Sequence, residues 1–235
     1  MHALPTDGIE AVLFDLDGTL MDTDDQAVER LGRRLRHLGL RDPQRAARWL
    51  VMAAETPLNA LMTLLDLVGL DRPLSRLSRQ LCRWRGVSTS PEFRIIPGVP
   101  QMLACLKEHY RLAIVTTRPR CDALAFLGQY GLDGSFEVLV TSESTFRLKP
   151  HPAPIRQAIE ALGLPPERCL MVGDTTVDMR SARRAGVWAL GVLCGFGERR
   201  ELERAGAHAI LESTADLASL LLDERDRIVP CAPTC

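Results

Sequence analysis

The chain has 235 residues, of which 46% are hydrophobic and 25% charged, a composition typical of a soluble globular protein. Its 29 basic and 30 acidic residues give a net charge of −1, so no overall charge points to nucleic acid or to a membrane surface. The seven cysteines contain no CxxC pair, which favours the reducing cytoplasm over a disulfide framework. For Cys231 and Cys235, a frayed tail, a metal site and a labile disulfide all stay open.

An apolar run near the start of the chain leads into two closely spaced carboxylates. Residues 11–14 are all apolar and predict a short buried strand. Asp15, Asp17 and Gly18 follow, so both carboxylates come at the carboxyl end of that strand, where Gly18 permits a turn. Like charges this close repel unless a cation offsets them, and Mg²⁺ prefers oxygen ligands. A solvated turn explains the same residues, so this stretch alone leaves both interpretations open.

The next part of the chain, residues 22–92, shows only helical patterns. Apolar residues recur there at three- and four-residue spacing, beginning with Ala27, Leu31, Leu35 and Leu38. We therefore predict an all-helical domain at residues 22–92, inserted into an α/β domain formed by residues 1–21 and 93–235.

From Ile95 onward, strand and helix patterns alternate. We expect strands at residues 112–115, 136–140, 169–172, 187–192 and 209–211. We expect helices at residues 99–109, 120–130, 152–162, 176–185, 199–204 and 215–222. Such alternation predicts an α/β fold, in which a Rossmann-like parallel sheet is flanked by helices on both faces.

Further polar residues follow the later strands. Thr116 and Asp174 each come directly after an apolar strand pattern, and Lys149 lies in the loop after another strand. Asp178 comes four residues after Asp174, one turn into a helix. Each residue has a structural explanation of its own, such as a helix cap or a solvated loop. Because ligands of parallel sheets bind outside the carboxyl ends of the strands, we expect these side chains to form one site.

Taken together, these residues resemble the four ordered motifs of the haloacid dehalogenase superfamily, and the resemblance extends from about Ile9 to about Leu222. The matching segments are Asp15-Leu-Asp17-Gly-Thr, Thr116, Lys149-Pro and Gly173-Asp174-Thr-Thr-Val-Asp178. The helical insert is similar to the C1 cap of that superfamily. Pro97-Gly98-Val99 and Leu112-Ala-Ile-Val-Thr116 look like its phosphoglycolate phosphatase-like branch.

The resemblance implies a Mg²⁺-dependent phosphatase that hydrolyses a small phosphomonoester metabolite through an aspartyl-phosphate. Asp15 would be the nucleophile, Asp17 the general acid and base, and Lys149 the cation that neutralises charge at the reaction centre. Mg²⁺ would be held by Asp15, Asp174 and the backbone carbonyl of Asp17.

The same resemblance implies a phosphate-binding set. The Thr116 hydroxyl and the backbone N–H groups of Gly18 and Thr117 would hold the phosphoryl oxygens. Asp178 would act from outside the metal ligands by orienting Lys149 or a metal-bound water. Arg118 stands where this branch often has Lys, so it is a candidate contact for an anionic substrate or a surface residue.

Single residues distinguish this chain from members of the superfamily with other activities. Dehalogenases lack the second carboxylate, so Asp17 favours phosphate chemistry. A pyrophosphatase and a phosphosugar mutase stay open as alternatives, and a catalytically inactive binding protein is disfavoured because Asp15, Asp17 and Asp174 are all present. We expect a small phosphorylated metabolite as the partner, with no nucleic acid or membrane. Substrate identity, the cap residues that select it and the oligomeric state cannot be determined from the sequence.

Overall fold

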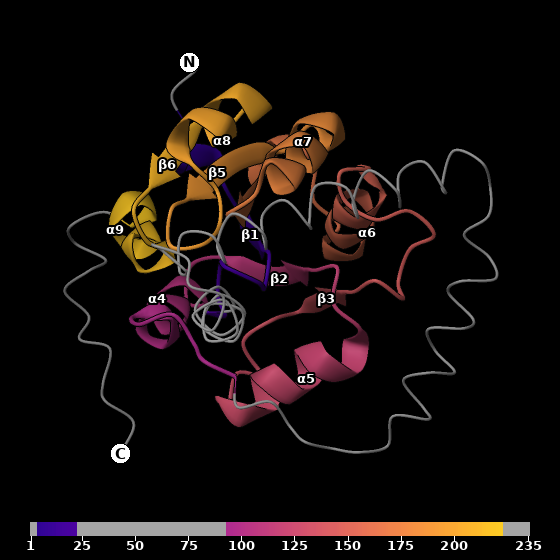
Figure 1. Cartoon of the computed structure of the whole chain (residues 1–235), viewed down its shortest axis with the longest axis vertical. Coiled ribbons are helices and arrows are strands. Elements are labelled where there is room, and N and C mark those ends of the chain that lie inside the picture. Colours follow the sequence, from indigo (N-terminus) through magenta and orange to yellow (C-terminus); the bar gives the residue numbers. More distant parts are fainter. Residues whose placement is uncertain (1–3, 23–92, 223–235) are drawn as a thin grey trace, which may run out of the picture. The chain divides into compact units, whose positions relative to one another are not determined.

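The structure is a computed structural model that describes residues 4–22 and 93–222. The helical domain predicted for residues 22–92 lies outside this part of the chain, except for Asp22, and so do Cys231 and Cys235. The described strands form one six-stranded parallel sheet in the order β3-β2-β1-β4-β5-β6 (Figure 1). They are β1 (Ala11–Phe14), β2 (Arg111–Val115), β3 (Val138–Val140), β4 (Cys169–Gly173), β5 (Trp188–Val192) and β6 (Ala209–Leu211).

The first strand lies in the middle of the sheet. Leu13 of β1 is paired with Ala113 of β2 on one side and with Met171 of β4 on the other. The strand order reverses at β1, because the chain builds β2 and β3 on one side of it and β4, β5 and β6 on the other. Ligands of open α/β sheets bind outside the carboxyl ends of the strands at such a reversal.

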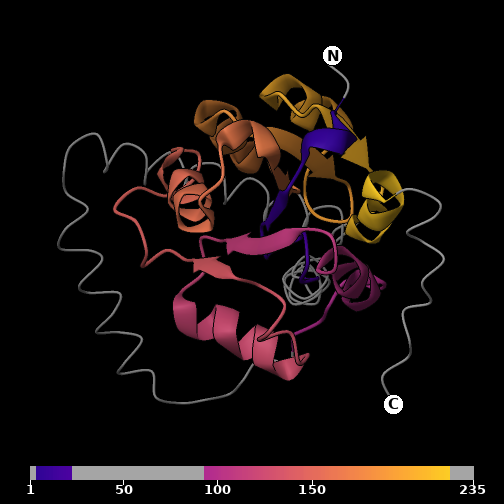
Figure 2. The same ribbon diagram turned by 180° about the vertical axis from the view of Figure 1, so that it is seen from behind.

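Helices cover both faces of the sheet, as Figure 2 shows from behind. The helices are α4 (Val99–Leu106), α5 (Arg120–Gln129), α6 (Ala153–Leu162), α7 (Thr176–Ala185), α8 (Arg199–Ala205) and α9 (Leu217–Leu221). Helices α4, α5 and α9 pack on one face, and α6, α7 and α8 pack on the other. None of these described helices has the length and apolar character needed to cross a membrane.

The alternation of side chains along β1 explains why its sequence is apolar throughout. Val12 and Phe14 belong to the core shared with α4, α5 and α9, whereas Ala11 and Leu13 belong to the core shared with α6, α7 and α8. All four are fully buried. Burying a side chain as large as Leu13 contributes about 1.5–3 kcal/mol, so each face anchors the strand independently.

The predicted α/β alternation is confirmed, and several element ends differ by a few residues. The helix predicted at 99–109 ends at Leu106, the strand predicted at 136–140 begins at Val138, and the last helix begins at Leu217. The last difference has a local cause. Ser213 accepts a hydrogen bond from the Ala215 N–H and starts a short 3₁₀ turn, Thr214–Asp216, ahead of α9.

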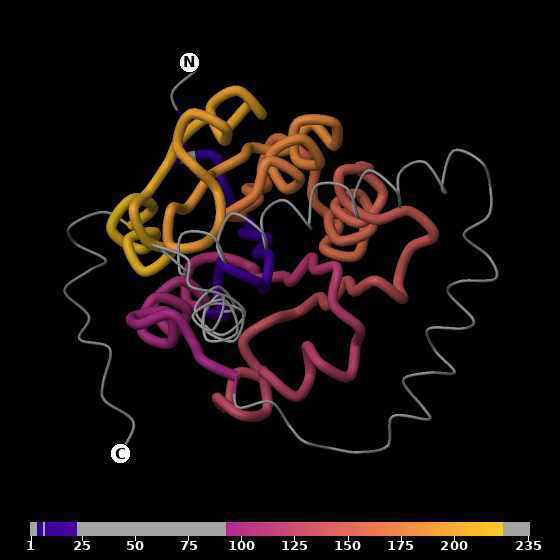
Figure 3. Tube along the Cα trace, in the orientation of Figure 1, coloured from indigo at the N-terminus to yellow at the C-terminus, as the bar shows by residue number. Residues whose placement is uncertain are grey.

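Two segments on either side of residues 23–92 are hydrogen-bonded to each other. The Asp22 N–H donates to the Arg94 carbonyl at 2.8 Å, and the Ile96 N–H donates to the Leu20 carbonyl at 3.0 Å. Met21 and Ile95 form an antiparallel bridge between the same segments. The segments that end at Asp22 and begin at Phe93 thus lie side by side in the part of the chain that the structure describes, which Figure 3 draws as a coloured tube.

Candidate active site

Polar side chains follow three neighbouring strands at one edge of the sheet. Asp15 follows β1, Thr116 follows β2 and Asp174 follows β4, and β1 lies between the other two. All three residues are buried, in contrast to most polar residues at strand ends. The predicted meeting of these residues at one edge is therefore found in the structure.

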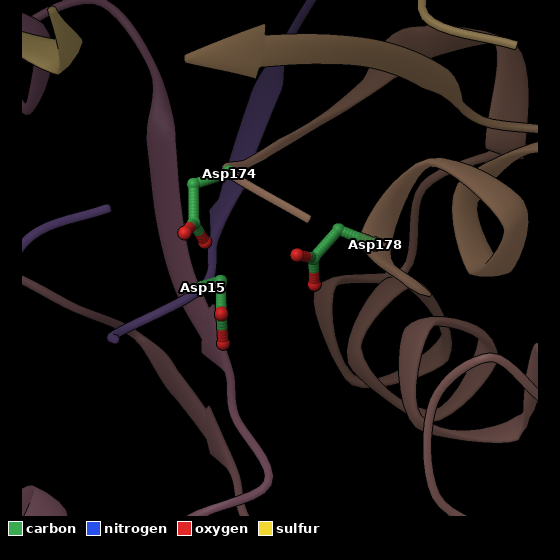
Figure 4. A group of neighbouring side chains, drawn as sticks. All are labelled: Asp15, Asp174 and Asp178. Atoms are coloured by element: carbon green, nitrogen blue, oxygen red, sulfur yellow. The ribbon is translucent and has the colours of Figure 1, made fainter. Parts of the chain in front are cut away.

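A buried lysine joins two of the aspartates. The Lys149 ammonium donates to Oδ1 of Asp15 at 2.7 Å and to Oδ1 of Asp178 at 2.6 Å. Lys149 comes from the loop between β3 and α6, and Asp178 from the first turn of α7. Figure 4 shows the Asp174 carboxylate above Asp15 and the Asp178 carboxylate facing both from α7. One ammonium thus lies between two carboxylates that come from distant parts of the sequence.

Both oxygens of the Asp178 carboxylate are engaged. Oδ1 accepts from Lys149, and Oδ2 accepts from the Thr175 hydroxyl at 2.5 Å and from the Thr175 N–H at 3.2 Å. The second pair of contacts forms the capping box that begins α7. Asp178 therefore links Lys149 to the first turn of α7.

The Asp174 carboxylate is enclosed by backbone. Its Oδ2 accepts from the Phe196 N–H at 2.9 Å, and its Oδ1 accepts from the Thr19 hydroxyl at 3.3 Å. A Cβ atom added to Gly18 would lie 2.2 Å from Asp174 Oδ2, and one added to Gly195 would lie 2.1 Å from it. Glycine at both positions lets two loops approach the carboxylate closely.

The surroundings change how the buried groups ionise. Burial raises the pKa of Asp15 to about 7; the charges of Asp178 and Asp17 act in the same direction, and Lys149 acts against them. Burial opposes the charged form of Lys149, but attraction by Asp15 and Asp178 outweighs it and raises the pKa of the ammonium. Lys149 is thus held as a cation.

The carboxylates fit a hard divalent cation. One oxygen from each of Asp15, Asp174 and Asp178 lies within 4.8 Å of the others, and all three residues are buried. Lys149 supplies one positive charge to three acidic groups, so ionisation of all three leaves excess negative charge in a desolvated place. Oxygen-only ligands suit Mg²⁺. Among the described residues, Asp15, Asp174 and Asp178 are thus the side chains that could hold it.

The second carboxylate of the first motif has a different partner. Asp17 is bound by the guanidinium of Arg118, whose Nη2 lies 2.6 Å from Asp17 Oδ1. Burial opposes the charge of Arg118, but the hydrogen bond and attraction from Asp17 outweigh it and raise the guanidinium pKa. Thr116 accepts from the Arg118 N–H at 3.1 Å through its side chain, which leaves its own hydroxyl proton to donate, and Thr117 is exposed.

The Gly18 N–H, which the resemblance assigns to the phosphoryl oxygens, has a partner in its own loop. Its N–H donates to the Met21 carbonyl at 2.8 Å, so in this conformation that N–H is not directed at a phosphoryl group. Its φ of 64° lies in the left-handed region, and a side chain there would collide with Asp174. The requirement for glycine is therefore conformational and steric.

Sequence reasoning missed the residues that hold Asp174. Thr19 is fully buried, and Phe196 contributes only its backbone N–H. The sequence does contain a signal for the contact between the Phe196 N–H and Asp174. Gly195 and Gly197 lie in the loop after β5, whose carboxyl end is at the same sheet edge. Paired glycines after a buried strand indicate close approach of backbone to a site.

Comparison with known proteins agrees with this architecture. Residues 12–192 match the model of the family described as haloacid dehalogenase-like hydrolase. The chain is 32% identical over 223 residues to a plasmid-encoded phosphoglycolate phosphatase of Cupriavidus necator, covering 92% of this chain and 94% of the relative. It is 30% identical over 214 residues to the pyrophosphatase PpaX of Anoxybacillus flavithermus, covering 91% and 97%.

Solved structures show the same relationship. A hydrolase from Pseudomonas syringae superimposes with a TM-score of 0.66 and 29% identity, covering 90% of this chain and 97% of that one. The family match spans most of the sequence, and it includes the strands that carry Asp15, Thr116 and Asp174. The chain therefore belongs to the haloacid dehalogenase-like hydrolase family.

Proposed function

We propose that the protein is a Mg²⁺-dependent phosphatase that hydrolyses a small phosphomonoester through an aspartyl-phosphate on Asp15. The observation that carries this proposal is the buried contact of Asp15 with Lys149, beside Asp174 and Asp178. A carboxylate with a fixed cation on one oxygen can approach an anionic phosphoryl group with less repulsion. The relatives named as phosphatases support the same class of reaction.

Each residue has a defined part in this reaction. An Asp15 oxygen attacks phosphorus while the bond to the leaving oxygen breaks, and Asp17 gives that oxygen a proton. Water then attacks the aspartyl-phosphate, Asp17 takes a proton from the water, and Asp15 is restored as inorganic phosphate leaves. Lys149 neutralises negative charge next to Asp15, and the Thr116 hydroxyl donates to a phosphoryl oxygen. When bound by Asp15 and Asp174, Mg²⁺ supplies charge stabilisation for the phosphoryl oxygens.

We further propose that residues 22–92 are a helical cap inserted into the α/β domain of residues 1–21 and 93–235. The paired segments at Asp22 and Arg94 support this arrangement, because an inserted domain enters and leaves its host at one place. The stretch from Asp17 to Met21 connects the catalytic strand to that place, so a cap movement would act on the same piece of chain. We propose a cytoplasmic location from the cysteine content.

The test is release of inorganic phosphate by the full chain, with Mg²⁺ and with a chelator. The substrates are 2-phosphoglycolate, glycerol 3-phosphate, a nucleoside monophosphate, pyrophosphate and p-nitrophenyl phosphate. We expect Mg²⁺-dependent release from at least one monoester. Asp15→Asn should lower turnover by at least about 10⁴-fold, because the nucleophile is lost.

The matched control is Asp133→Asn, which changes an exposed aspartate and should retain wild-type turnover. Circular dichroism should show that both variants are folded. Absence of Mg²⁺-dependent release from every substrate, or full activity in Asp15→Asn, would contradict the proposed function.

A further inference from the structure

The guanidinium of Arg118 holds the carboxylate of Asp17 with both of its oxygens engaged. Nε of Arg118 donates to Oδ1 at 2.9 Å and to Oδ2 at 2.7 Å, and Nη2 donates to Oδ1 at 2.6 Å. This forked contact is the geometry in which arginine binds a carboxylate most strongly. It crosses between the segments that follow β1 and β2.

This contact conflicts with the part proposed for Asp17. A general acid must place a carboxyl oxygen within hydrogen-bond reach of the leaving oxygen. In the structure both Asp17 oxygens face Arg118 instead. Asp17 must therefore leave the guanidinium before it can serve the reaction, whereas Asp15 can react while Lys149 stays in place.

The surroundings of Arg118 suit an exchange of partners. Its backbone is fixed, because its N–H donates to the Thr116 hydroxyl oxygen at 3.1 Å. Its side chain is one-quarter exposed, and the Asp122 carboxylate lies 3.9 Å from its Nη1. The charges of Asp122 and Asp15 also act on this guanidinium. An anion arriving from solvent can thus compete for the same fork of donors without moving the backbone.

We propose that Arg118 is a positioning residue that latches Asp17 in the ligand-free protein. A carboxylate or phosphate on the leaving part of the substrate opens the latch by replacing Asp17 on the guanidinium. The freed Asp17 carboxylate takes up a proton from solvent water and turns to the leaving oxygen. It then gives that proton to the leaving oxygen as the bond from phosphorus to that oxygen breaks. This inference rests on the proposed phosphatase function and extends it, because it makes the leaving group itself the trigger for the general acid.

The latch predicts opposite effects of one substitution on two substrates. In Arg118→Gln, kcat/KM for 2-phosphoglycolate, whose leaving group carries a carboxylate, should fall by about 10-fold or more because a charge-assisted contact is lost. For glycerol 3-phosphate, whose leaving group is neutral, kcat should rise by about two- to fivefold, since Asp17 no longer has to leave a half-exposed ion pair. With p-nitrophenyl phosphate, whose leaving group needs little protonation, kcat should change by less than about twofold.

The ratio of kcat for glycerol 3-phosphate to kcat for p-nitrophenyl phosphate within one preparation is independent of the folded fraction. A rise in this ratio in Arg118→Gln can therefore be measured even where the variant folds poorly. Arg118→Lys keeps the charge but loses the fork, and its ratio should lie between those of the wild type and Arg118→Gln. The matched control is Arg120→Gln, which changes an exposed arginine at the start of α5 and should keep the wild-type ratio.

A fall of both activities by the same factor in Arg118→Gln would overturn the latch. So would an unchanged glycerol 3-phosphate rate with only the 2-phosphoglycolate rate reduced, because Arg118 would then bind substrate without restraining Asp17. Failure of the proposed function is distinguishable from both results, since the wild type would then release no phosphate in the presence of Mg²⁺.

Discussion

Two cation–carboxylate contacts lie near the carboxyl end of β1, and they differ in burial. The side chains of Lys149, Asp15 and Asp178 are 3%, 10% and 1% exposed. The side chains of Arg118 and Asp17 are 25% and 30% exposed. Asp15 and Asp17 belong to the same motif and are two residues apart. The cation that contacts Asp15 is shielded from water, whereas the cation that contacts Asp17 is partly exposed to it.

This difference in burial sets how costly it is to separate the charges of each pair. In the buried network, removing one partner leaves a charge without water or a counter-ion. In the partly exposed pair of Arg118 and Asp17, water or another anion can replace either partner, so the contact is exchangeable. Burial therefore suits Asp15 to a fixed part in the reaction and leaves Asp17 able to move.

A third ion pair provides a reference far from the site. Arg111 of β2 and Glu137 form a forked contact at 2.6–3.0 Å with side chains 42% and 47% exposed. The three contacts thus form a series from buried to exposed, and the effect of breaking each should fall along that series.

The largest effect is expected for Lys149→Met, which removes the cation from the buried network. We expect a loss of about 3–5 kcal/mol in the free energy of unfolding, because Asp15 and Asp178 are left without it. Turnover should fall by about 10²–10³-fold through lost charge stabilisation. Urea unfolding and phosphate release measure the two effects.

The control is Lys107→Met, because Lys107 is the only other lysine of the chain and is exposed. That variant should change stability by less than about 0.5 kcal/mol. Equal stability and turnover of the two variants would mean that the buried contact is dispensable.

An intermediate effect is expected for Gly195→Ala, which disturbs the loop backbone packed against the buried carboxylate of Asp174. The new Cβ would lie 2.1 Å from Asp174 Oδ2, so the carboxylate or the loop must shift. We expect the Mg²⁺ concentration for half-maximal activity to rise by about 10–100-fold. The Mg²⁺-dependent increase in Tm should shrink as well, which gives a readout independent of turnover.

Gly134→Ala is the matched control, since a Cβ at Gly134 would meet no atom within 4 Å. An unaltered Mg²⁺ dependence in Gly195→Ala would show that the close approach of this loop does not position Asp174.

The smallest effect is expected for Glu137→Gln at the exposed end of the series. The variant should lose about 0.2–1 kcal/mol at pH 7. The hydrogen bond from Arg111 lowers the pKa of Glu137 below its ordinary value of 4.5. A lowered pKa in the folded state adds stability above pH 4.5, and that stability is lost as the pH falls through the lowered pKa.

The difference between wild type and Glu137→Gln, measured by urea unfolding, should therefore close below pH 4.5. Glu160→Gln, which changes another exposed glutamate, should show no such closure. A difference that stays constant down to acid pH would mean that Arg111 does not act on Glu137 through its charge.

The amino-acid sequence by itself determined the parallel α/β core and the candidate residues. Apolar runs such as residues 11–14 predict buried strands because both faces of a parallel sheet are covered, and a polar residue directly after such a run lies at the sheet edge. Asp15, Thr116 and Asp174 could be placed on this rule alone. The exact ends of short elements such as β3 could not, because they depend on pairing with a neighbouring strand.

Only the tertiary structure decided how those residues pair. Arg118 and Asp17 are 101 positions apart, Lys149 and Asp15 are 134 apart, and Thr19 and Asp174 are 155 apart. Motif spacing describes neighbours along the chain, whereas hydrogen bonds and burial depend on neighbours in space. That is why one motif contains both a carboxylate held by a buried lysine and a carboxylate held by an arginine within reach of water.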